Sequence, residues 1–137
     1  MTFENFQYSE RQIKAYLTNA KKDLARALKY DDSDLSFRLG YDALIKLAIT
    51  VCAFESLRVK SRVGHHIELL EKAAAILKSL EIKEIGDMMR KRRNKDLYGG
   101  GIFVSVKEVE ESRLFLVKIF ELAEEYLHKK SGRVKLL

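Results

Sequence analysis

The chain has 137 residues, of which 47% are apolar and 34% are charged, and its formal net charge is +6. This length fits one domain with its own core, and this composition excludes an intrinsically disordered chain. The only cysteine, Cys52, excludes an internal disulfide, and the longest strongly apolar run, LAITVCAF, is too short to cross a bilayer. We therefore expect a cytoplasmic protein that does not enter a membrane, with a basic charge that permits an acidic partner such as nucleic acid.

Apolar residues recur at intervals of three and four along the chain, which predicts helices. The chain has no proline, so the strongest helix breaker is missing. The expected helices span about residues 9–30, 33–57, 65–80, 83–98 and 105–129. These elements predict an all-α fold, an up-and-down helical bundle of four main helices plus one shorter helix. We expect a single domain of residues 1–137 with a flexible tail from residue 130.

Several local patterns mark the helix starts. Ser9 with Gln12 and Ser105 with Glu108 have the spacing of capping boxes, and the stretch YDDSD offers an N-cap before the second helix. That second helix is apolar almost all round at its C-terminal end, which predicts a place in the centre of the domain. Gly40 lies inside it, where we expect close contact with another helix. Only GIFVSV has strand-like composition, and it is short.

Metal and nucleophile sites are poorly supported by the sequence. His65 and His66 are adjacent, and neither a Cys-x-x-Cys nor a His-Glu-x-x-His pattern occurs. Histidines at the start of a helix beside a basic connector are typical surface residues. Cys52 lies in the most apolar helix, where a thiol is usually an inert core group. We therefore expect no metal and no cofactor.

The fourth helix loses its apolar pattern part-way along. At about 100° per residue, Ile82, Ile85, Met88 and Met89 form one arc, which the sequence continues with Arg92 and Asp96; Arg93 lies at the edge of the arc. A polar pair on an inward arc indicates a cleft or a subunit contact, and the alternative is that this end of the helix protrudes into water.

The stretch RKRRNKDLYGGG combines arginines with an asparagine and a tyrosine. Arginine presents a planar fork to phosphate, and tyrosine can stack on an unpaired base. A second basic stretch, SLRVKSRVGHH, would make a positive groove with the first if the two meet in space.

The motif RRNKDLY resembles the late-helix motif of the HEPN superfamily, whose members are small helical bundles that bind nucleotides or RNA. Arg93 and Asn94 match the arginine and polar residue that begin that motif, and Tyr98 stands where the family usually has a histidine. The resemblance covers nearly the whole chain and implies a homodimer in which two such helices meet. Active members are metal-independent ribonucleases, and many are toxins paired with a nucleotidyltransferase antitoxin.

The tyrosine is the main departure from the family. Its reference pKa is about 10, so it is a poor general base at neutral pH. His65 or His66 could supply a base if their loop folds over Arg93. We therefore expect a site that binds RNA or a nucleotide, catalytically weak or inactive, through Arg93, Asn94 and Tyr98. The supporting nucleic-acid-binding residues are Arg58, Lys60, Arg62, His65, His66, Arg90 and Arg92.

Two alternatives remain open from the sequence. The first is an active metal-independent ribonuclease of the toxin type, in which Arg93, Asn94 and Tyr98 are the catalytic residues. The second is a protein-interaction module that pairs with a nucleotidyltransferase antitoxin through its apolar helices.

Overall fold

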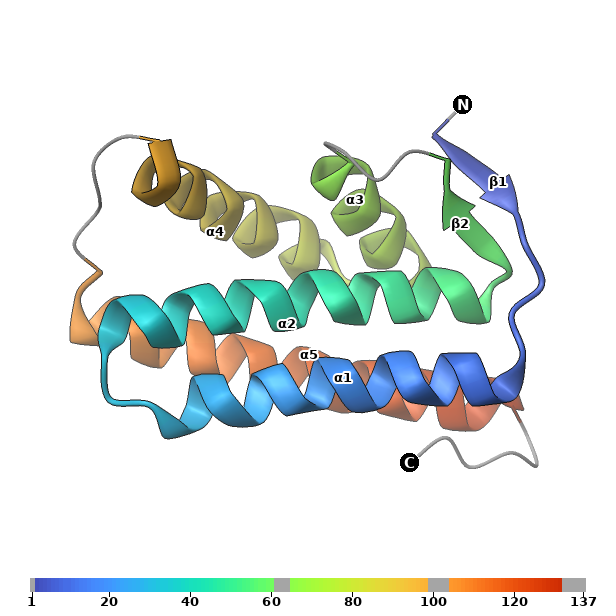
Figure 1. The fold of residues 1–137 in the computed structure, drawn as a ribbon, viewed down its shortest axis with the longest axis horizontal. Coiled ribbons are helices and arrows are strands. Elements are labelled where there is room, and N and C mark those ends of the chain that lie inside the picture. The colour runs from blue at the N-terminus through green and yellow to red at the C-terminus, as the bar shows by residue number, and fades with distance from the viewer. Residues whose placement is uncertain (1, 61–64, 99–103, 132–137) are drawn as a thin grey trace.

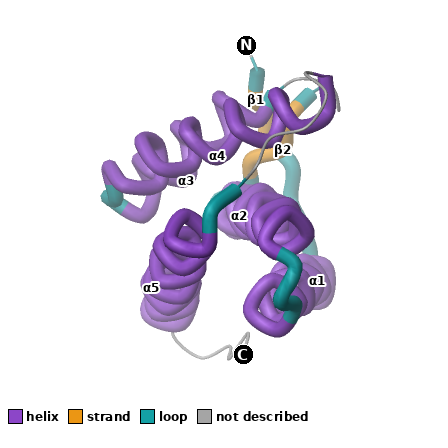
Figure 2. Tube along the Cα trace, turned by 90° about the vertical axis from the view of Figure 1, so that its left-hand side faces the viewer, coloured by secondary structure: helices purple, strands orange, loops and turns teal. Residues whose placement is uncertain are grey.

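The computed structural model describes residues 2–60, 65–98 and 104–131, with the side chains of residues 96–98 outside this description. In chain order the elements are β1 (Phe3–Asn5), α1 (Glu10–Lys29), α2 (Ser33–Phe54), β2 (Leu57–Val59), α3 (His66–Leu77), α4 (Leu80–Tyr98) and α5 (Val106–Ser131). Over the described residues this is the predicted all-α bundle, and α3, with 12 residues, is the shorter helix. The helices α1 and α5 run alongside α2 on one side of it, and α3 and α4 lie on its other side (Figures 1 and 2).

The central element is α2, as its apolar sequence predicts. It contacts each of the other helices and β2, and its C-terminal half is buried on nearly every side. Gly40 confirms the expected close contact, because a Cβ atom there would lie 2.8 Å from Leu116 Cδ1 of α5. The described core residues form one cluster around this helix.

The predicted helix starts are confirmed by their hydrogen bonds. The Ser9 amide donates to Gln12 Oε1 at 2.9 Å, and the Gln12 amide donates to Ser9 Oγ at 3.1 Å. Ser105 and Glu108 form the same reciprocal pair at the start of α5. Asp32 is the N-cap of α2, since its Oδ1 accepts the Leu35 amide at 2.9 Å. These caps satisfy amides that have no partner inside a helix.

The second helix is shorter than predicted. It ends at Phe54, and Ser56 has a φ of 60°, a left-handed conformation that turns the chain out of the helix. Leu57–Val59 then forms β2, which pairs antiparallel with β1 in the register Phe3↔Val59. The expectation of helix up to residue 57 was therefore wrong, and this two-stranded sheet was missed.

Other boundaries also differ from the prediction. Lys78 has a φ of 54° and ends α3 at Leu77, where its amide donates to the carbonyl oxygen of Ala74. The next helix, α4, begins at Leu80, before the predicted position 83. The last helix, α5, reaches Ser131, so the expected start of the tail at residue 130 falls inside this helix; residues 132–137 lie outside the described part, as do residues 101–103, the first half of the strand-like GIFVSV.

Candidate functional site

A buried tyrosine, a histidine and an arginine from three different helices meet at one place. Tyr41 of α2 is 0% exposed, and its hydroxyl oxygen lies 2.8 Å from Nδ1 of His66, the first residue of α3. The guanidinium carbon of Arg93, on α4, lies 5.7 Å from the centre of the Tyr41 ring. We call these three residues the Tyr41 cluster.

The face that α4 turns to the core explains why Arg93 reaches this place. Ile82 and Met89 are 1% and 0% exposed, and Gly86 between them is buried, so the inner face follows steps of four and three residues. The next step of four from Met89 reaches Arg93. Met88 is 47% exposed, so the expected arc through Met88 was wrong.

Arg92 is half-buried beside the inner face of α4, and its Nε atom is buried. Its guanidinium forms an ion pair with Glu108 of α5 at 2.9 Å. Arg92 therefore joins α4 to the start of α5, whereas Arg93 continues the buried face. The expected partner of Arg92, Asp96, has its side chain outside the described residues.

The imidazole of His66 is held in its neutral form. Burial lowers the pKa of His66 below its ordinary value of 6.5, and the positive charges of Arg93 and Arg90 lower it further against the opposing effect of Asp42. At neutral pH the ring is therefore uncharged, with one nitrogen donating and the other accepting.

The phenol of Tyr41 is also neutral, because burial raises its pKa to about 12 even though Arg93 and Arg90 act in the opposite direction. A buried hydroxyl hydrogen needs an acceptor. The Nδ1 lone pair of His66 supplies one at 2.8 Å, which places the ring hydrogen of the neutral imidazole on Nε2. The Tyr41 cluster therefore combines an N–H donor on His66 with the guanidinium of Arg93.

Carboxylates near the cluster are distributed unevenly. Arg90 forms an ion pair with Asp87 at 3.1 Å, whereas Arg93 has no carboxylate within ion-pair distance among the described residues. Burial raises the pKa of Asp42, and Arg93 acts in the opposite direction. Of the two arginines at this site, Arg93 is thus the one without a direct ion pair to a carboxylate that the structure describes.

The structure brings together some of the expected site residues and separates others. His66, Arg90 and Arg93 gather around Tyr41, so the two basic stretches do meet at His66 and Arg93. The remaining residues have other positions: Asn94 is half-buried on α4, Tyr98 ends α4 with its side chain outside the description, His65 lies 3.5 Å from Glu68, Arg58 pairs with Glu4 at 2.6 Å, Lys60 follows β2, and Arg62 lies outside the described residues.

His66 was expected on the surface, and this was wrong: the ring is half-buried against Tyr41, with the two ring centres 5.6 Å apart. Tyr41 and Asp42 were missed altogether. Their signal in the sequence is a tyrosine and an aspartate inside an apolar helix, because a buried tyrosine usually needs a hydrogen-bond partner.

Cys52 is an inert core residue, as predicted. Burial raises the pKa of its thiol to about 12, so the nucleophilic thiolate is absent at neutral pH. Among the described residues, no group of three or more histidine, cysteine or acidic side chains is placed to hold a metal ion. No helix in the described part of the chain is long and apolar enough to span a membrane.

The comparisons with known proteins give no assignment: we find no significant match of this chain to a protein-family model, to a curated protein or to a solved structure. The functional interpretation therefore depends on the chemistry of the Tyr41 cluster.

Proposed function

We propose that this protein binds RNA or a nucleotide, and that the Tyr41 cluster contacts a phosphate group. The observation that carries this proposal is the position of Arg93, half-buried on the ring of Tyr41 with no described carboxylate in ion-pair distance. A guanidinium in such a setting can present its planar fork to a phosphate. The Nε2–H group of His66 adds a neutral donor beside it.

The neighbouring residues fit the same role. Arg90 adds positive charge to the site while its ion pair with Asp87 fixes its side chain. Asn94 follows Arg93 in the sequence and is half-buried, so its amide is a further group for hydrogen bonds to phosphate, ribose or base. The net charge of +6 favours approach of a polyanion over long range.

The test is the affinity for a short single-stranded RNA, measured by fluorescence anisotropy at low salt. We expect Arg93→Ala to weaken binding by about tenfold and to reduce the slope of log K against log salt by about one counterion. Arg93→Lys keeps the charge but loses the planar fork, so its affinity for RNA should lie between that of the unmodified protein and that of Arg93→Ala.

The matched control is Arg11→Ala, which removes the same charge from an exposed position on α1. If Arg93→Ala and Arg11→Ala weaken binding equally, the RNA senses only the overall charge and the proposed site is wrong. Undetectable binding of the unmodified protein to RNA and to nucleotides would also reject it.

A second candidate, a metal-independent ribonuclease, is favoured by one observation: the neutral imidazole of His66 lies in the same cluster as Arg93. A general base needs a free ring nitrogen. This requires the other tautomer, in which Nδ1–H donates to the Tyr41 oxygen and Nε2 accepts a proton. Because that arrangement leaves the buried phenol hydrogen without its acceptor, we place this activity second.

Cleavage of single-stranded RNA in the presence of EDTA would distinguish this candidate from simple binding. If the protein is a nuclease, we expect it to cleave the RNA, and we expect His66→Ala and Tyr98→Phe to lose this cleavage while they retain their affinity for RNA. If the protein binds RNA and leaves it intact over hours, the binding function stands alone. The homodimer, the toxin–antitoxin role and the nucleotidyltransferase partner stay predictions of the family resemblance.

A further inference from the structure

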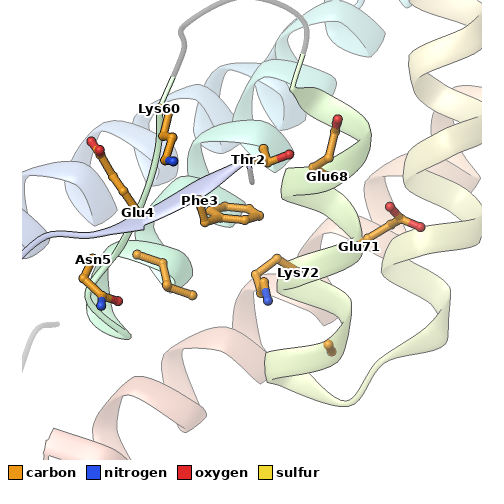
Figure 3. Close-up of a pocket in the computed structure, with 10 residues that line it drawn as sticks. Thr2, Phe3, Glu4, Asn5, Lys60, Glu68, Glu71 and Lys72 are labelled. Atoms are coloured by element: carbon orange, nitrogen blue, oxygen red, sulfur yellow. The ribbon is translucent and has the colours of Figure 1, made fainter.

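A cavity of about 650 Å³ lies between the two-stranded sheet and α3 (Figure 3). Phe3, Asn5 and Leu57 line it from the strands, and Lys72 and Ala75 line it from the helix. A space of this volume is in the range of sites that hold small organic molecules. It shares no lining residue with the Tyr41 cluster, so it is a separate candidate site.

Two of the three carboxylates around this cavity have cationic partners outside it, and the third, Glu68, lies 3.5 Å from Nδ1 of His65. Glu71 lies 3.6 Å from Lys83 of α4, and Glu4 forms a close ion pair with Arg58 at 2.6 Å. In Figure 3 the carboxylate ends of Glu68 and Glu71 point away from the space between the strands and the helix. The acidic residues therefore contribute little negative charge to the interior of the cavity.

Lys72 has the opposite arrangement. Its Nζ lies over the ring of Phe3, 5.4 Å from the ring centre, on the side of α3 that faces the strands (Figure 3). An ammonium group at this distance is attracted to the face of an aromatic ring, which limits where it can lie. No carboxylate among the described residues forms an ion pair with Lys72. Lys60, at the end of β2, adds a second positive charge at the rim.

The remaining wall is apolar. Phe3 and Leu57 are partly buried against the core, and their exposed surfaces face the cavity together with Ala75. An uncompensated cation next to such a wall suits a molecule with an anionic group at one end and a flat apolar body. A small cation or an uncharged polar molecule would leave one of these two features unused.

We propose that the sheet–α3 cavity binds a flat organic anion, with the anionic group on Lys72 and the apolar body against Phe3 and Leu57. The ligand class is an aromatic carboxylate or sulfonate of less than the cavity volume. This site is independent of RNA binding at the Tyr41 cluster and goes beyond it.

The test uses two probes of nearly identical shape, 8-anilinonaphthalene-1-sulfonate and its uncharged parent 1-anilinonaphthalene, titrated by fluorescence into the folded protein. We expect saturable binding of the sulfonate at one site per chain. Lys72→Met keeps the apolar stem and removes the charge, so it should weaken the sulfonate by about tenfold or more and leave the uncharged probe unchanged. Lys14→Met, at an exposed position of α1, is the charge-matched control and should change neither.

Amide NMR spectra of the same titration locate the probe and show that each variant is folded. Shifts at Leu57 and Ala75 that saturate with the fluorescence would support the proposal. Three results would overturn it: no saturable binding of the sulfonate at millimolar concentration, equal affinity for unmodified protein and Lys72→Met, or shifts confined to other parts of the molecule.

Discussion

At the scale of single residues, Tyr41 organises the candidate site. It is a fully buried phenol in an apolar helix, and its hydroxyl needs a partner that α2 itself does not offer. His66 supplies that partner from the start of α3, and Arg93 approaches the ring from α4. The hydrogen bond from Tyr41 to His66 therefore links α2 to α3 and sets the tautomer of the imidazole, and the contact of Arg93 with the Tyr41 ring adds α4.

We predict that Tyr41→Phe lowers the free energy of unfolding by about 1–2 kcal/mol, the usual cost of losing a buried hydrogen bond without a change in volume. Urea denaturation followed by circular dichroism measures it. Tyr126→Phe is the control, because the Tyr126 hydroxyl bonds Glu55 at an exposed position and its loss should cost less. Equal losses in the two variants would contradict a special role for Tyr41.

The lowered pKa of His66 predicts a pH dependence of stability. The unfolded chain binds a proton near the ordinary value of 6.5 and the folded one only at lower pH, so unfolding is favoured as the pH falls through this window. We expect stability to decrease as the pH falls below the ordinary pKa of about 6.5, with a smaller decrease in His66→Gln. Denaturant titrations at several pH values test this. A decrease of the same size in both proteins would assign the effect to other groups.

The adjacent histidines show the limit of the sequence at this scale. Their positions in the sequence do not predict that His65 lies near Glu68 and that His66 contacts Tyr41, because Tyr41 is 25 positions away from His66 in the sequence. The motif did point to Arg93, but the count along the helix placed Arg93 only at the edge of the inner arc. That error came from including the exposed Met88 in the apolar arc.

At the scale of elements, Arg113 of α5 closes the C-terminal end of α1. Its guanidinium donates to the carbonyl oxygens of Ala27 at 3.2 Å and Tyr30 at 2.7 Å, and to Ser36 Oγ at 3.3 Å. Carbonyls at the end of a helix have no partner within it and carry partial negative charge, so the half-buried guanidinium of Arg113 stabilises them. The turn between α1 and α2 is fixed by a residue from the far end of the chain.

We predict that Arg113→Met destabilises the protein by about 1–3 kcal/mol, because the Tyr30 carbonyl and the Ser36 hydroxyl oxygen lose the guanidinium donor and the Ala27 carbonyl keeps only the Ser36 hydroxyl. The comparison is Lys118→Met, which removes an exposed ion pair with Glu81 and should cost less than about 1 kcal/mol. Thermal and urea unfolding of both variants measure the difference. A loss in Arg113→Met no larger than in Lys118→Met would show that water replaces the guanidinium.

The sequence predicted which segments are helical better than it predicted where they end. Period and capping residues are local, so all of the described helices and the starts of α1, α2 and α5 follow from them. The ends after Phe54 and Leu77 depend on two residues in the left-handed conformation, Ser56 and Lys78. Neither is a glycine or an asparagine, the residue types that favour this conformation and would have predicted it. The sheet was missed because each strand is three residues long and is stabilised by a partner far away in the sequence.

At the scale of the whole molecule, α3 carries parts of both candidate sites. His66 at its start belongs to the Tyr41 cluster, and Lys72, less than two turns further on, lines the cavity beside the sheet. The helix contacts α2 and α4, so both sites depend on how it packs there. The positive groove expected from sequence is accordingly divided: Arg93 and His66 lie at one site, and Arg58 and Lys60 lie near the sheet.

The most direct test of phosphate binding at the Tyr41 cluster is an NMR titration of the His66 ring with and without an RNA oligonucleotide protected from cleavage by 2′-O-methyl groups. A phosphate beside Arg93 favours the charged imidazolium. The account predicts that saturating RNA raises the pKa of His66 and that Arg93→Ala abolishes the rise. A His66 pKa that does not change while RNA is bound would contradict the account.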